Sequence, residues 1–360
     1  MAKPEQHFPG NYRQGRAAFL QACEANDLGI TTRVLPDAKG PDGHALYLDT
    51  TVIGERDAKS AVLLISGTHG VEGYFGSGAQ TALLRGGLAK RAKKGVKFVL
   101  LHALNPFGFA WNRRVNEQNA DVNRNFVNHA KPPANRDYDK LVDAISPRSI
   151  AKDEYSQANA RLREYALAHG DFALQEAISA GQYKHPHGIY FGGPAESWSA
   201  QMLKDVFREE LKGVERLIAI DFHTGLGAPG AAEMITEDLP GSSAYKRARK
   251  LWGARVQSSE AGESLSPPLK GTLDKAVARW MRGKELTFAA LEVGTAPVRD
   301  VFDALRKDNW LHEYAGLRAR NAKVIKQQIR DAFYPDTATW KRKVWNHAAD
   351  VVESAVNAIA

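Results

Sequence analysis

Several features that would restrict this protein to particular classes are scarce or missing from its sequence. It has one cysteine, Cys23, in 360 residues, so no disulfide can form within the chain. No apolar run reaches the roughly eighteen residues that predict a membrane-spanning helix. The N-terminus, Met1-Ala2-Lys3-Pro4-Glu5-Gln6-His7, opens into no apolar segment of the kind that marks a signal peptide. We therefore expect a cytoplasmic protein with no membrane partner.

Acidic residues are outnumbered, and the formal net charge is +8. Basic residues cluster at 85–94 and again at 341–343. A basic surface is one sign of a nucleic-acid partner, but no DNA- or RNA-binding motif accompanies these clusters. We interpret them as solvated helix ends and expect no nucleic-acid partner, while the oligomeric state stays open.

Short apolar segments that end in glycine or polar loops alternate with helical patterns along the chain. Segments that are apolar on both faces, such as Val62-Leu63-Leu64-Ile65, are typical of a central sheet covered by helices on both sides. The predicted strands are 45–52, 61–66, 96–101, 216–222 and 286–293. The predicted helices are 12–25, 76–84, 243–252, 272–281, 298–314, 316–333 and 337–359.

This alternation predicts a single α/β domain over residues 1–360. We expect a mixed, largely parallel sheet of about eight strands between helices. Residues 127–200 are charged, helical and without strong strand signals, so we interpret them as a helical insertion. We expect residues 316–360 to form two C-terminal helices, which Pro335 separates.

Three of the predicted strands end in a side chain that can bind a metal or carry a proton. His69 and Glu72 follow the strand 61–66 in a glycine-rich loop, His223 ends a second buried strand, and Glu292 ends a third. In open α/β sheets, ligands bind at the carboxyl ends of the strands. Two histidines and a carboxylate form a hydrolytic zinc set that leaves a position for water. The sequence therefore predicts one zinc ion per chain, held by His69, Glu72 and His223.

The segment 104–126 is rich in arginine and asparagine and follows another predicted strand. Guanidinium groups recognise carboxylates through paired, charge-assisted hydrogen bonds. A polar loop in which asparagines form turns is the alternative interpretation.

The order of these motifs resembles the M14-type zinc metallocarboxypeptidase clan. The resemblance runs from about residue 61 to residue 295. It consists of His-x-x-Glu, then Asn-Pro-x-Gly, an arginine, Asp-x-Asn-Arg-Asn-Phe, a distant histidine, and a glutamate near a strand end. The signatures Gly-Thr-His-Gly-x-Glu-Gly and Phe-His-Thr-Gly-Leu-Gly resemble a bacterial, DUF2817-like branch of this clan.

The resemblance implies a role for each matching position. Glu292 would activate water and then protonate the leaving amine, and Arg114 would stabilise the oxyanion, with its neighbour Arg113 as the alternative. Asn123 and Arg124 would hold the carboxylate of the substrate.

Two further residues complete the expected site. Asp121, from the same motif, would orient the imidazole of His69. Tyr190 is a candidate for the wall of the substrate pocket, although the glycines that follow it also predict a simple turn.

The expected activity is hydrolysis of an amide bond next to a free carboxylate in a peptide, as in a carboxypeptidase-type exopeptidase. The alternative is an N-acyl amino acid deacylase similar to aspartoacylase and succinylglutamate desuccinylase, which would act on an acylated amino acid. A catalytically silent binding protein is less favoured, because the metal-binding residues, the glutamate and the arginine are all present.

Overall fold

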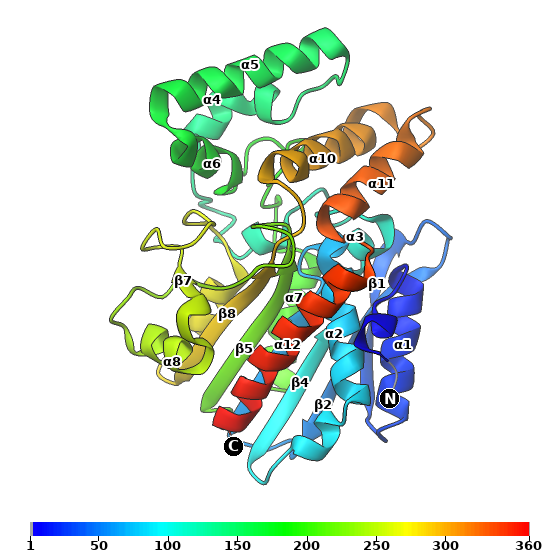
Figure 1. The fold of residues 1–360 in the computed structure, drawn as a ribbon, viewed down its shortest axis with the longest axis vertical. Helices are drawn as coiled ribbons and strands as arrows, with labels where there is room; N and C mark the ends of the chain where they lie inside the picture. Colours follow the sequence, from blue (N-terminus) through cyan, green and yellow to red (C-terminus); the bar gives the residue numbers. More distant parts are fainter. Residues whose placement is uncertain (1–2, 360) are drawn as a thin grey trace.

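Eight strands form one sheet in the computed structural model, which describes residues 3–359 (Figure 1). The strands are β1 (Ile30–Lys39), β2 (Ala45–Gly54), β3 (Ser60–Ser66), β4 (Val96–His102), β5 (Arg216–Thr224), β6 (Ala232–Thr236), β7 (Val256–Ser258) and β8 (Glu285–Val293). Their order across the sheet is β1-β2-β4-β3-β5-β8-β6-β7. The fold is thus the α/β class that the sequence predicts.

The centre of the sheet is parallel and its margins are mixed. Strands β4, β3, β5 and β8 run parallel to one another. The antiparallel pairs are β1 with β2, β2 with β4, and β6 with β8. The carboxyl ends of the four parallel strands therefore meet at one edge of the sheet, where ligands bind in open α/β folds.

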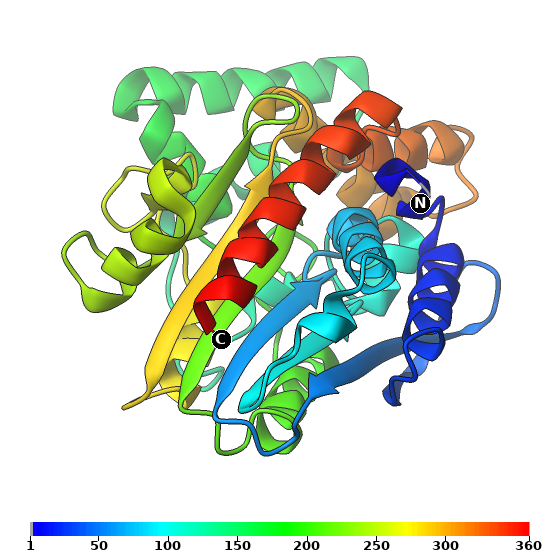
Figure 2. The ribbon, with the colours of Figure 1, turned by 60° about the horizontal axis from the view of Figure 1, so that its bottom comes forward.

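Helices cover both faces of the sheet. The helices of one face are α1 (Tyr12–Glu24), α2 (Gly73–Arg85), α8 (Ser243–Trp252) and α12 (Ala338–Ile359). Figure 2 shows α12, in red, crossing this face, where it contacts β3 and β5. The other face is covered by α7 (Trp198–Glu209) and α9 (Leu273–Trp280). Among the described helices, none combines the length and the apolar composition that crossing a bilayer requires.

The side chains of β3 explain why its sequence is apolar without alternation. Val62 and Leu64 pack into the core below α2 and α12, whereas Leu63 and Ile65 pack into the core below α7 and α9. Successive side chains of a strand point to opposite faces, so a strand covered on both sides needs apolar residues at every position.

Most of the remaining helices lie at one end of the molecule (Figure 1). They are α4 (Arg136–Ile145), α5 (Lys152–His169), α6 (Asp171–Ser179), α10 (Val298–Trp310) and α11 (Ala322–Phe333). The short helix α3 (Pro106–Trp111) instead packs beside α1, where it contacts β1 and β2. Helices α4, α5 and α6 fall within residues 127–200 and share a small core that includes Tyr138, Leu141 and Leu162.

The structure corrects several of the predicted boundaries. Strands β1, β6 and β7 were not predicted, because the edge strand β1 is largely exposed, β6 is only partly buried and β7 has three residues. Helix α7 begins at Trp198, inside the segment 127–200, yet its apolar side packs against the sheet. Helix α10 ends at Trp310 and is followed by a π-helical turn, and α11 begins at Ala322, six residues later than Gly316.

Candidate metal centre

His69 and Glu72 lie in the tight connection between β3 and α2. A 3-10 turn over Gly70–Glu72 leads directly into α2. The backbone of this turn is docked on the arginine segment, since the amide of Gly70 donates to the carbonyl of Arg114 over 3.1 Å. A Cβ atom at Gly70 would lie 2.0 Å from the carbonyl carbon of Gly108. Only glycine fits this close approach of two backbones.

His223 and Glu292 come from neighbouring strands. They are partners in the parallel register of β5 and β8, so their backbones lie side by side although the sequence separates them widely. Residues in register on adjacent strands point to the same side of the sheet. This register brings the third predicted metal ligand next to the predicted proton carrier.

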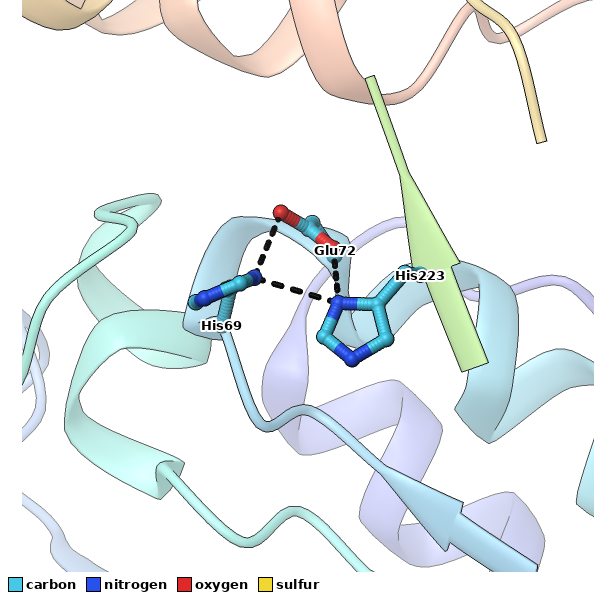
Figure 3. A group of neighbouring side chains, drawn as sticks. All are labelled: His69, Glu72 and His223. Atoms are coloured by element: carbon cyan, nitrogen blue, oxygen red, sulfur yellow. Dashed lines mark hydrogen bonds and ion pairs between the residues drawn. The ribbon is translucent and has the colours of Figure 1, made fainter. Parts of the chain in front are cut away.

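Three donor groups converge at the edge of the sheet (Figure 3). The Nδ1 atom of His69 lies 2.9 Å from Oε1 of Glu72, and Nδ1 of His223 lies 3.0 Å from Oε2 of the same carboxylate. The two Nδ1 atoms are 3.2 Å apart. All three side chains are buried. The structure thus brings together the three residues that the sequence proposed as ligands.

The far ring nitrogen of each histidine is held by a buried carboxylate. Nε2 of His223 lies 2.8 Å from Asp221, and Nε2 of His69 lies 3.1 Å from Asp121. Asp221 also accepts a hydrogen bond from Thr68 over 2.9 Å. Carboxylates in this position orient the imidazole of metal-binding histidines and raise its basicity.

Asp221 was missed in the sequence, although a signal for it was present. Residues i and i+2 of a strand point to the same face, so the Asp-x-His pattern of β5 already places Asp221 beside His223.

These residues fit a cation such as zinc. A proton on Nε2 of His223, facing Asp221, leaves the lone pair of its Nδ1 directed at the same point as Glu72. Two imidazole nitrogens and a carboxylate are the donors that suit zinc, and they leave a coordination position open.

The electrostatics of the three groups agree with this fit. Although burial works in the opposite direction, Asp221 and Glu72 hold the pKa of His223 well above its usual value. Against the effect of burial, His69 and His223 hold the pKa of Glu72 below its usual range. Positive charge is therefore favoured at this position, and a bound cation would supply it.

Arg114 and Arg113 point in different directions. Arg114 faces the centre: its Nε donates to Asp121 over 2.8 Å, Nη1 donates to Glu72 over 3.3 Å, and Nη2 lies 2.8 Å from Nε2 of His69. Arg113 is buried away from the cavity and bonds to Asp308 over 3.3 Å and to Asn119 over 2.9 Å. Contrary to our expectation, Arg113 is therefore not positioned to contact a substrate or an oxyanion.

Arg124, Asn123 and Tyr190 line the cavity next to the centre. Two guanidinium nitrogens of Arg124 donate to the carbonyl of Ser179 over 3.0 and 2.8 Å, and the amide oxygen of Asn123 accepts from the backbone of Leu273. The ring of Tyr190 lies near two cations, with its centroid 5.1 Å from Cζ of Arg114 and 5.7 Å from Cζ of Arg124. Tyr190 adopts a left-handed backbone conformation, with φ +57°, which is uncommon for a bulky residue. The structure thus places this residue in the pocket wall as well as in a turn.

Glu292 faces the same cavity. Its Oε1 accepts a hydrogen bond from the amide of Leu226 over 3.0 Å. Burial and the negative charge of Glu72 raise its pKa to about 8. A carboxyl with a pKa near neutral pH is suited to take up and release a proton.

One cavity of about 620 Å³ is lined by every site residue that the sequence predicts except Arg113 and Asp121. Sequence reasoning missed most of its wall, which includes side chains of α5, α6 and α10 and the acidic pair Glu237 and Asp274. A cavity of this size with convergent polar groups is the usual form of a ligand site.

The family model described as "Protein of unknown function (DUF2817)" matches residues 8–347. The chain belongs to the DUF2817 family. A comparison with curated proteins finds no match.

Solved structures similar to this DUF2817 protein include metallocarboxypeptidases and an aspartoacylase-family protein. Carboxypeptidase A from Helicoverpa armigera is 12% identical, with coverage of 94% of this chain and 73% of that one and a TM-score of 0.44. A putative carboxypeptidase A from Shewanella denitrificans is 14% identical, with 95% and 71% covered and a TM-score of 0.45. An aspartoacylase family protein from Mesorhizobium loti is 16% identical, with 81% and 69% covered and a TM-score of 0.38. Similarity at this level does not identify a substrate.

Proposed function

We propose that this protein is a zinc-dependent hydrolase that cleaves an amide bond next to a free carboxylate, in the manner of a carboxypeptidase-type exopeptidase. One observation carries the proposal: His69, Glu72 and His223 converge on one point in a cavity that also presents Glu292 and Arg124. Metal ligands alone would suit a structural site. A proton carrier and a carboxylate anchor in the same cavity favour catalysis.

Each residue then has a defined task in the hydrolysis. A zinc ion held by His69, Glu72 and His223 would supply Lewis acidity for the amide carbonyl and would lower the pKa of water to about 7. Glu292 accepts a proton from the attacking water and delivers it to the nitrogen of the leaving amine as the C–N bond breaks. Arg114 donates hydrogen bonds to the carbonyl oxygen as negative charge develops on it. Asp121 and Asp221 keep the imidazoles of His69 and His223 in place.

Arg124 and Asn123 select for a substrate with a free carboxylate. Arg124 is almost completely buried, and its guanidinium bonds only to backbone carbonyls. Carbonyl groups do not neutralise its charge. The negative charge of Asp121 favours the charged form of Arg124, but this carboxylate already accepts a hydrogen bond from Arg114. A substrate carboxylate is a natural partner for a buried guanidinium in this position.

The test compares free-acid substrates with their C-terminally amidated forms on the zinc-loaded protein. We expect Arg124→Ala to lower kcat/KM for the free acid by roughly 10- to 100-fold, the effect of one charge-assisted contact, and to change turnover of the amide much less. Arg163→Ala is a matched control, because Arg163 lines the same cavity from α5 but is exposed. Equal turnover of both substrates by wild type and Arg124→Ala would rule out the carboxylate anchor.

The second candidate function is deacylation of an N-acyl amino acid. It is favoured by the helices α5, α6 and α10, whose side chains line the cavity beside the metal centre. Walls on this side restrict the space that a long polypeptide would need. A panel of acylated amino acids and short peptides separates the two activities, and complete inactivity of the zinc-loaded protein toward both classes would favour a silent binding protein.

A further inference from the structure

The cavity extends from the metal centre into a compartment formed by three helices that belong to neither face of the sheet. Its walls are apolar side chains of α5, α6 and α10. We name this set the apolar compartment, and it consists of Leu162, Ala166, Leu174, Ile178, Val298, Val301, Phe302 and Leu305. Binding a metal ion and a carboxylate requires none of these residues, so the compartment calls for a separate explanation.

A buried arginine joins α10 to α5 and α4, and α6 packs against α4 and α5 in a shared apolar core. Arg306 of α10 is 2% exposed, and its guanidinium donates to Asn159 of α5 over 2.6 Å and to the carbonyl of Ala144 in α4 over 2.7 Å. The same group stacks on Tyr155 of α5, with Cζ 4.3 Å from the ring centroid. The walls are therefore set before any ligand arrives, which reduces the entropic cost of binding.

The compartment is also joined to the polar end of the site. Arg124, the proposed carboxylate anchor, bonds to the carbonyl of Ser179 at the end of α6. On the same helix, Ile178, which directly precedes Ser179, and Leu174, one turn before Ile178, line the cavity. A ligand held by Arg124 thus lies next to the apolar wall.

Apolar side chains continue to the mouth of the cavity. Val298 lines the cavity and is 52% exposed, and Leu265, which is 56% exposed, directly precedes the cavity-lining residues Ser266 and Pro267. Gln175 of α6 bonds to the carbonyl of Leu265 over 2.8 Å, so this rim is attached to the insertion. The charged residues of the three helices that reach the cavity, Arg163, Asp171 and Arg299, are all exposed. Charge is thus confined to the solvent side of the compartment.

We propose that the apolar compartment binds a large aliphatic or aromatic group of the substrate, so that the substrates are amides that carry a free carboxylate and a bulky apolar group. This inference rests on the proposed hydrolytic function and names its substrate class. A cavity of about 620 Å³ is far larger than an acetyl group requires, and its apolar walls gain by contact with apolar ligand atoms.

The first experiment uses acetyl, hexanoyl and decanoyl derivatives of one amino acid as substrates of the zinc-loaded protein. Burial of each methylene is expected to raise kcat/KM by roughly three- to fourfold until the compartment is filled. A constant or falling kcat/KM from acetyl to decanoyl would overturn the proposal.

Two variants locate the effect. Ala166→Phe fills the compartment, and we expect it to lower kcat/KM for the decanoyl substrate at least tenfold while the acetyl substrate is little affected. Ala168→Phe, on the exposed side of the same helix, is the matched control. Leu174→Gln is a second variant with the same expected direction, in case Ala166→Phe does not fold.

A binding measurement separates this inference from the proposed hydrolysis. Calorimetric titration with decanoate and acetate requires no turnover, and we expect decanoate to bind wild type at least tenfold more tightly than it binds Ala166→Phe. Chain-length-dependent binding without hydrolysis of any amide would contradict the proposed function alone. Hydrolysis with no chain-length dependence, or equal decanoate binding by wild type and Ala166→Phe, would contradict the compartment alone.

Discussion

Replacement of Asp121 by asparagine is a sensitive test of the metal centre, because it removes one charge and little volume. Asp121 is fully buried, and its two oxygens serve three partners. Oδ1 lies 3.1 Å from Nε2 of His69 and accepts from the amide of Asn123 over 3.0 Å. Oδ2 accepts from Nε of Arg114 over 2.8 Å. An asparagine offers a single acceptor oxygen, so one of its sides must present an N–H group to a donor.

The size of the effect follows from the contacts that are lost. Asp121→Asn loses the hydrogen bond to Arg114 in one orientation and the bonds to His69 and Asn123 in the other. A hydrogen bond to a charged partner is worth about 1.5–3 kcal/mol. Losing a carboxylate that orients a metal-bound histidine weakens metal affinity by roughly 10- to 100-fold, or about 1.4–2.7 kcal/mol. The two ranges overlap, and we expect the zinc Kd to rise by about that factor while one zinc ion per chain still binds at saturation.

The assay is competition for zinc between the protein and a chelator of known affinity. Asp308→Asn is the matched control, since Asp308 is an equally buried carboxylate that pairs with Arg113 and Lys326 outside the cavity. We expect Asp308→Asn to lose folding stability but to keep the wild-type zinc Kd. A folded Asp121→Asn protein with an unchanged Kd, or an equal loss of affinity in Asp308→Asn, would refute the assignment of Asp121.

Three further predictions follow from single side chains. Glu292→Gln should retain zinc but lose turnover by roughly 10²- to 10⁴-fold, the usual contribution of a general acid–base residue, and an active variant would exclude Glu292 from proton transfer. Gly70→Ala should cost about 1–3 kcal/mol in chemical denaturation and weaken zinc binding, because its Cβ would overlap the backbone of Gly108, whereas Gly29→Ala, which meets nothing within 4 Å, should be nearly neutral. Burial lowers the pKa of His102 to about 4. The unfolded chain therefore binds a proton that the folded chain does not between pH 6.5 and 4, and stability should fall by about 3 kcal/mol as the pH decreases through that interval. His102→Phe should remove that part of the pH dependence, and an unchanged slope in urea unfolding would contradict it.

The sequence by itself determined the features that depend on local pattern. Unbroken apolar runs such as Val62–Ile65 indicate strands covered on both faces, because a strand buried on only one side would alternate. The His-x-x-Glu spacing places His69 and Glu72 within one turn of the chain, so their proximity needs no tertiary information. The parallel α/β core and the closeness of His69 and Glu72 could therefore be predicted.

Other features depend on contacts between distant segments. Arg113 and Arg114 are adjacent and chemically identical, and only their surroundings decide that Arg114 faces Glu72 while Arg113 faces Asp308, 195 residues away. The edge strand β1 carries little apolar signal because most of it is exposed, and the packing of its neighbours decides its place.

The cavity combines features that follow from local sequence with features that depend on contacts between distant segments. The end that holds the proposed metal ligands follows from three strand exits that the sequence marks with histidine and glutamate. Its apolar end is assembled from α5, α6 and α10, whose cavity-facing residues resemble any other apolar helix positions until the fold leaves them facing a cavity. Local sequence encodes which side chains are apolar or ionisable, but only the tertiary structure decides which of them face one another, because that depends on strand order, register and helix packing.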